Sequence, residues 1–240
     1  MALSSWLDDP VISVARGRIR NAESFYKFGY NSAITNSSET IWDAGGTYSF
    51  PASASALSVA STASGDTSLS VTLIGLDENY DELTETVTLD GTDATTAVTS
   101  NNSFLRIHRA FIAGSTAPTG NITMKIGVVT HAQITAGENQ TLMLVYTVPA
   151  GHALYVKKGS ISHGSDDKTA FITGRLKTRA FGGVFRTQNV QNLNNGFLEF
   201  DWEVPLRVAE KTDIIAEAVC SKNQTNAVSA TLQGVLIDER

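Results

Sequence analysis

The stretch NITMKIGV, residues 121–128, alternates between large apolar residues and residues that are polar or small. Ile122, Met124, Ile126 and Val128 therefore share one side of an extended chain, because successive side chains of a strand point to opposite faces. A helical spacing of apolar residues does not fit this stretch. The pattern predicts a β-strand with one buried face.

The same two-residue alternation recurs along the chain, for example in residues 69–73 and 83–89, and sustained helical periodicity is nearly absent. Further strands are expected at residues 104–112, 142–148, 153–162, 168–181, 197–204, 213–219 and 228–237. Turn-forming sequences separate them, at residues 90–91, 117–120, 149–151, 182–183 and 194–196. Many short strands at this spacing predict an all-β protein with two antiparallel, jelly-roll-like β-sandwich domains.

Three regions of the chain differ in their apolar pattern. Residues 1–30 have no clear core pattern and are expected to form an extended N-terminal arm. Residues 31–130 contain one set of strands, and residues 131–240 contain a second set. The join between the two sets is short, so two β-sandwich domains that pack against each other are expected.

The composition favours other proteins as partners over nucleic acid or membranes. Of the 240 residues, 42% are hydrophobic and only 18% are charged, while Ser and Thr make up about a fifth. Neutral polar side chains suit surfaces that pack on another protein, where desolvating a charge is costly. The net charge of −6 argues against nucleic acid as a direct partner. With Cys220 as the single cysteine, no secretory signal and no long apolar run, neither a disulfide nor a membrane partner is expected.

Residue types that carry catalysis or bind metals are not arranged in a recognisable motif. The four histidines stand at positions 108, 131, 152 and 163, and none is three to five residues from another. A nucleophile elbow and a phosphate-binding glycine loop are also lacking. Cys220 is interpreted as a small buried residue and not as a nucleophile. We therefore expect no enzyme activity, no catalytic residues, no metal and no cofactor.

The acidic segment DENYDE, residues 77–82, is the strongest candidate for a metal site. Oxygen ligands at alternate positions are how a calcium-binding loop begins. Glu82, however, stands where that loop needs glycine, and Thr88 stands where it needs a bidentate glutamate. Because the segment also lies between two expected strands, an acidic hairpin turn is favoured over a metal site.

The N-terminal arm contains the candidate assembly residues. Trp6 has Ser and Asp neighbours, so it is interpreted as an apolar anchor that docks onto another protein, whereas Trp202 lies among apolar residues and is expected in the core. In an extended arm Arg16, Arg18 and Arg20 would share one side, and their charges would repel unless a partner neutralises them. A solvated basic strand is the alternative interpretation.

Three pieces of the sequence resemble a known group of proteins. FYKFGYNSAITNSSETIWDAGGTYSFP at residues 25–51, GLDENY at 75–80 and ETVTL at 85–89 are similar to tailed-bacteriophage virion structural proteins, particularly those of aquatic phages. The likeness covers roughly residues 14–130 and is only general beyond residue 133. It implies a virion component that is assembled in the host cytoplasm and has no catalytic residues.

The residues and the resemblance together leave three classes of function open. These are a capsid decoration (cement) protein whose arm binds the outside of the phage head, a tail or fibre adaptor or hub, and a receptor-binding appendage that recognises carbohydrate. The first is favoured because the chain is short, has an arm and lacks the repetitive shaft of a fibre. A Thr-rich surface with an unpacked arm also predicts self-association, most simply as a homotrimer. Expected partners are copies of the chain itself and the major capsid protein or other virion proteins.

Overall fold

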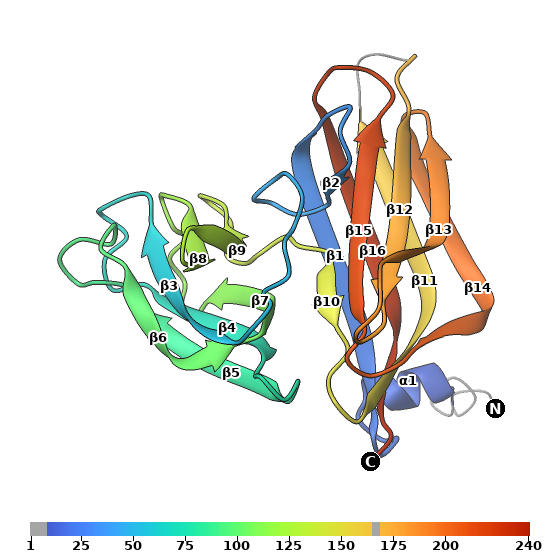
Figure 1. Cartoon of the computed structure of the whole chain (residues 1–240), viewed down its shortest axis with the longest axis horizontal. Helices are drawn as coiled ribbons and strands as arrows, with labels where there is room; N and C mark the ends of the chain where they lie inside the picture. The colour runs from blue at the N-terminus through green and yellow to red at the C-terminus, as the bar shows by residue number, and fades with distance from the viewer. Residues whose placement is uncertain (1–8, 165–168) are drawn as a thin grey trace, which may run out of the picture.

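The computed structural model describes residues 9–164 and 169–240, which form sixteen β-strands and one short helix. Every strand pairing in these residues is antiparallel. The strands are arranged as two sandwiches of different size that lie side by side (Figure 1). The prediction of an all-β fold is confirmed.

The larger sandwich consists of two facing sheets with an apolar core between them. The first sheet, here sheet A, has the strand order β1 (Ala22–Ile34), β16 (Asn226–Asp238), β11 (His152–Gly164), β14 (Gly196–Val208). The second, sheet B, has the order β10 (Val145–Thr147), β15 (Asp213–Cys220), β12 (Ile172–Arg179), β13 (Arg186–Leu193), and β2 (Glu39–Thr40) pairs with β15. Because β14 and β13 end these orders, both are edge strands.

The smaller sandwich is built in the same way from seven strands. One sheet has the order β6 (Val98–Phe104), β3 (Ser55–Ser61), β8 (Ile122–Ile126), β9 (Val129–Ile134). The other has the order β5 (Glu82–Thr88), β4 (Ser70–Leu76), β7 (Arg106–Ile112). Their inward side chains, among them Leu57, Leu73 and Phe104, are completely buried.

The smaller sandwich is an insertion into the larger one. The chain forms β1 and β2, passes through β3 to β9, and returns to the larger sandwich at β10. This arrangement differs from the expected boundaries near residues 30 and 130, because β1 begins at Ala22 and β9 continues to Ile134. Strand β1 pairs with β16 at the opposite end of the chain, its burial pattern does not alternate strictly, and its register shifts between Asn31 and Ile34. Local alternation therefore identified neither the strand nor its partner.

The two sandwiches share apolar packing. Ile215 and Val145 belong to sheet B, yet both are buried in the apolar cluster of the smaller sandwich, together with Met143 and Trp42. An isolated bridge between Trp42 and Met143 joins the same region through the backbone. The outer side of sheet B thus supplies part of the smaller sandwich's core, so the two units pack as one body.

The N-terminal segment is not wholly extended, in contrast to the expectation for the arm. Helix α1 (Pro10–Ala15) begins after Asp9, whose Oδ1 accepts a hydrogen bond from Val11 N at 2.7 Å. An Asp cap followed by proline at the first helical position is a favourable start for a helix. Among the described residues α1 is the one helix, and none of them forms a helix that is long and apolar enough to span a membrane.

The stretch that led to the fold prediction forms a strand only up to Ile126. Ile122 and Met124 are fully buried, as the alternation predicts. Gly127, at φ +59°, takes the first position of a two-residue hairpin turn between β8 and β9, and Val128 is 93% exposed. The turn ends the alternation because Val128 no longer faces the core.

Replacing Ile215 by Ala should lower the free energy of unfolding by about 2–5 kcal/mol, because its side chain packs between sheet B and the smaller sandwich. Urea unfolding followed by circular dichroism measures this change. The control Val128→Ala removes an exposed side chain and should change the value by less than about 0.5 kcal/mol. Equal effects of the two substitutions would show that the sandwiches share no core.

Candidate functional site

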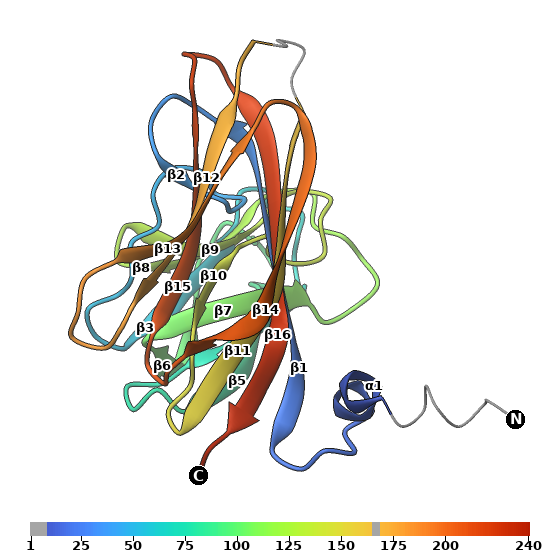
Figure 2. The same cartoon turned by 90° about the vertical axis from the view of Figure 1, so that its right-hand side faces the viewer.

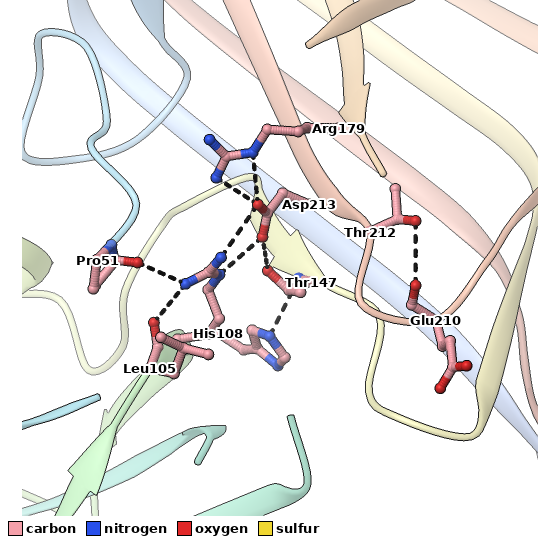
Figure 3. A network of polar contacts seen from close by, with 9 residues as sticks. Pro51, Leu105, His108, Thr147, Arg179, Glu210, Thr212 and Asp213 are labelled. Atoms are coloured by element: carbon pink, nitrogen blue, oxygen red, sulfur yellow. Dashed lines mark hydrogen bonds and ion pairs between the residues drawn. The ribbon is translucent and has the colours of Figure 1, made fainter. Parts of the chain in front are cut away.

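A buried polar network joins the two sandwiches (Figure 3). Its centre is Asp213, at the start of β15 in the larger sandwich, with a side chain that is 4% exposed. Arg106, at the start of β7 in the smaller sandwich, donates from Nε to Asp213 Oδ1 at 2.8 Å and from Nη2 to Oδ2 at 3.3 Å. Arg179, at the end of β12, donates from Nη2 to the same Oδ2 at 2.6 Å. One carboxylate therefore binds two guanidinium groups from different sandwiches.

The remaining polar atoms of this network are also paired. Thr147 donates its hydroxyl to Asp213 Oδ1 at 2.6 Å, and its backbone N–H donates to His108 Nε2 at 3.2 Å. Arg106 Nη1 donates to the carbonyl oxygens of Pro51 at 3.0 Å and Leu105 at 2.9 Å. Buried charges are tolerated when they are paired and fully hydrogen-bonded, which is the condition met here.

Aromatic rings cover the two guanidinium groups. The Phe50 ring centroid lies 5.2 Å from Arg106 Cζ and 5.1 Å from Arg179 Cζ. Tyr80 lies 5.5 Å from Arg106 Cζ, and Phe185 lies 4.7 Å from Arg179 Cζ. Cation–π attraction of this kind is strongest where water is excluded, so the rings hold the arginines in place around Asp213.

A second group of buried ionisable residues lies nearby. Lys27 of β1 donates from Nζ to the His108 carbonyl oxygen of β7, which is another contact between the sandwiches. Burial, together with a smaller effect of the charge of Arg109, lowers the pKa of Lys27 to about 7, and the charge of Asp43 opposes this shift. Burial raises the pKa of Asp43 to about 7, although its carboxylate accepts a hydrogen bond from Leu142 N at 3.1 Å.

His108 is held in its neutral form. Burial, followed by the charges of Lys27 and Arg106, keeps its pKa well below the ordinary value. Its Nε2 accepts the hydrogen bond from Thr147, which requires an unprotonated nitrogen. A neutral histidine with this hydrogen bond orients the backbone of β10.

The sequence predicted none of the residues at the centre of this network. Arg106 stands between Leu105 and Ile107, and Asp213 immediately precedes two isoleucines. A single charge at the edge of an apolar strand is a signal that could have identified both, because a charge in such a position needs a buried partner. Their pairing could not be predicted, because 107 positions separate the two residues in sequence.

The predicted assembly residues lie apart from the network. Trp6 lies outside the described residues. Arg16 caps the C-terminal end of α1, and Arg18 and Arg20 follow in a turn, with all three exposed. Because Gly17 adopts φ +64°, the three arginines do not follow the extended geometry that the alternation assumed.

The other candidate residues are held by hydrogen bonds within the fold or pack against its core. The acidic segment is a hairpin turn between β4 and β5, as predicted, and Asp77 Oδ1 accepts hydrogen bonds from the N–H groups of Asn79 and Asp81. Cys220 is buried, and its Sγ accepts a hydrogen bond from Asn226 Nδ2 at 3.0 Å. Trp202 packs partly buried against the core of the larger sandwich. In residues 9–164 and 169–240, no group of three His, Cys, Asp or Glu side chains could hold a metal ion.

Comparison with known proteins gives only weak similarity. No family model matches the chain, and no curated protein matches it. Among solved structures, the chain is similar to those of the Gt and Gx strains of infectious bursal disease virus, each at 12% identity and a TM-score of 0.27, with 90% of this chain and 72% of the other covered. A VP2 subviral particle of the same virus has 10% identity and a TM-score of 0.21, with 92% and 78% covered. Similarity at this level carries no argument about function.

Replacing Asp213 by Asn should lower the free energy of unfolding by about 3–5 kcal/mol, because it leaves the buried Arg106 without its counter-charge. Chemical denaturation of the two proteins measures the difference. The control Glu239→Gln breaks the exposed ion pair with Arg207 and should cost at most about 1 kcal/mol. A similar small cost for both substitutions would mean that the network does not stabilise the contact between the two sandwiches.

The stability of the protein should rise between pH 7 and pH 9 through Lys27. The folded chain releases this proton near pH 7, whereas the unfolded chain holds it up to about its ordinary pKa of 10.5. The cost of burying the charge is therefore fully present below pH 7 and is relieved as the pH rises above 7. Relative to Lys27→Met, which does not titrate, the wild-type free energy of unfolding should increase by about 2 kcal/mol across this range. A difference that stays constant in urea titrations at the two pH values would contradict this assignment.

Proposed function

We propose that the chain is a non-enzymatic structural protein of a tailed-phage particle. In this proposal it is a capsid decoration (cement) protein that binds the outside of the phage head through its N-terminal segment. It acts as a homo-oligomer, most simply a trimer, and resides in the virion. The support from the sequence is the resemblance of residues 14–130 to virion structural proteins, and the low charge of a Thr-rich chain.

The observation that carries this proposal is that α1 is ordered but contributes nothing to either core. The helix has no buried residue, and Val11 is 62% exposed. A six-residue helix has little stability by itself, since helices this short are marginal in water without packing partners. A segment that is ordered, apolar on one side and basic at its end suits a contact with a neighbouring protein.

The joint between the sandwiches supports the same role. Its ion pairs, cation–π contacts and shared apolar residues hold two β-sandwiches in one orientation. A decoration protein has to transmit load between the particle surface and its own exposed parts, so a rigid joint is useful to it.

A receptor-binding appendage is the second candidate. Strand β1 is an edge strand whose Tyr26 and Tyr30 are 58% and 39% exposed on sheet A. Neighbouring strands of the same sheet carry the hydroxyl pair Ser160 and Thr231 at 2.6 Å. Aromatic faces beside hydroxyl groups are suited to carbohydrate, so glycan binding by the purified protein would favour this alternative.

Deletion of residues 1–20 should abolish attachment to particles while leaving both sandwiches folded. The first fully packed strand begins at Ala22, and none of residues 9–20 is buried in a core. Particles that lack the protein are mixed with intact or truncated protein, and occupancy is measured by gel densitometry. Circular dichroism and thermal unfolding of the truncated protein serve as the folding control. Equal loading of the two proteins would show that the anchoring surface lies in the sandwiches.

A further inference from the structure

A groove lies between helix α1 and sheet A of the larger sandwich. Its volume is about 470 Å³, and most of its lining is apolar. Val11 and Val14 of α1 form one wall, and Val235 of β16 lies in the sheet opposite. The charged residues of the same lining are Lys157, Lys158 and Asp201. Figures 1 and 2 show α1 beside the beginning of β1 and outside the two sandwiches. The groove therefore exposes apolar surface that residues 9–164 and 169–240 leave uncovered.

Two sets of opposite charge lie next to this groove. Strand β14 is the outer edge of sheet A and carries Glu199, Asp201 and Glu203 at alternate, exposed positions. Glu199 pairs with Lys158 at 2.7 Å, whereas Asp201 and Glu203 form no ion pair with any other described residue. Asp201 in the groove lining and Glu203, two positions further along β14, are therefore not neutralised by the described residues.

The basic set follows α1 directly. Arg16, Arg18 and Arg20 are exposed, and they form no ion pair with residues 9–164 or 169–240. Asp201 lines the same groove as α1, yet the arginines of the same molecule do not bind it. Within the part of the chain that the structure describes, neither set of charges is neutralised, and the two sets are opposite in sign.

We propose that a second copy of this chain occupies the groove. Its α1 places the exposed Val11 side in the groove, and its Arg16, Arg18 and Arg20 pair with Asp201 and Glu203 of the first copy. A surface that carries both an apolar projection and an apolar groove, with both signs of charge, is complementary to itself, as contacts between identical subunits require. A partner of a different kind would need only the groove with its carboxylates or only the helix with its arginines, and not both.

The inference rests on the proposed function and names the partner of the three arginines in it. The residues before α1, including Trp6, remain for the contact with the head. Pairing of exposed opposite charges steers association and selects the partner, while the apolar surface supplies most of the affinity. The contact can form either a dimer or a ring of three copies, because each copy carries both the helix with its arginines and the groove with its carboxylates.

Charge reversal in the full-length protein tests the contact. One variant carries Arg16→Glu, Arg18→Glu and Arg20→Glu, and the other carries Asp201→Arg and Glu203→Arg. Each variant alone should associate at least about tenfold more weakly than wild type, because like charges then face each other across the contact. An equimolar mixture of the two should recover association, since the reversed charges are again complementary. Sedimentation over a range of concentrations measures the assembly.

Matched controls separate this contact from general charge effects and from misfolding. Arg186→Glu reverses an exposed arginine on β13 and should leave association unchanged. Val11→Asp should weaken association, whereas Val128→Asp, at an exposed turn of the smaller sandwich, should not. Thermal unfolding of each variant should stay close to that of wild type, since all these side chains are exposed.

Several outcomes would overturn the inference. A wild-type protein that remains a 25.6 kDa monomer at micromolar concentration would do so, as would a mixture of variants that stays dissociated. Loss of particle loading after arginine reversal, with association unchanged, would assign the arginines to the head. Association as predicted without particle loading would instead refute the proposed function and leave the contact standing.

Discussion

The carboxylate of Asp213 lies between the guanidinium groups of Arg106 and Arg179, and these three side chains come from both sandwiches. Because Asp213 is almost completely buried, its charge can be accommodated only where cations and hydrogen-bond donors surround it. Thr147 supplies the further donor, and Phe50 packs against both arginines. This requirement fixes the positions of the start of β15, the end of β12 and the start of β7 relative to one another.

The insertion of the smaller sandwich makes such a joint necessary. Two chain crossings connect the units, one after β2 and one before β10, so covalent connection alone leaves their relative orientation poorly determined. Apolar packing around Ile215 and Met143 provides attraction that has little directionality. The ion pairs and the contact from Lys27 to the His108 carbonyl add the directional part. The contact between the sandwiches thus combines apolar burial, which has little directional preference, with ion pairs and hydrogen bonds that fix the orientation.

The N-terminal segment contrasts with this interior. Helix α1 has a good cap at Asp9 and proline at its first position, so local sequence favours its formation. Its apolar side nevertheless faces a groove and not a core. The molecule therefore has one contact that is completed within the chain and one surface that is left for another protein. The proposed function and the proposed contact between copies both use the N-terminal segment, the first through the residues before α1 and the second through α1 and the arginines that follow it.

The sequence by itself determined the class of fold and several local features. Two-residue alternation in stretches such as residues 121–126 specifies strands, and turn residues such as those at 77–82 specify hairpins, because both depend on neighbours in the chain. The burial of Cys220 was predictable from its apolar strand for the same reason. Only the tertiary structure decided the domain boundaries, since the pairing of Ala22 with Ile237 depends on residues at opposite ends of the chain. It also decided the network around Asp213: a charged residue in a sequence shows that a partner is needed, but the partner is chosen by which strands the fold brings together.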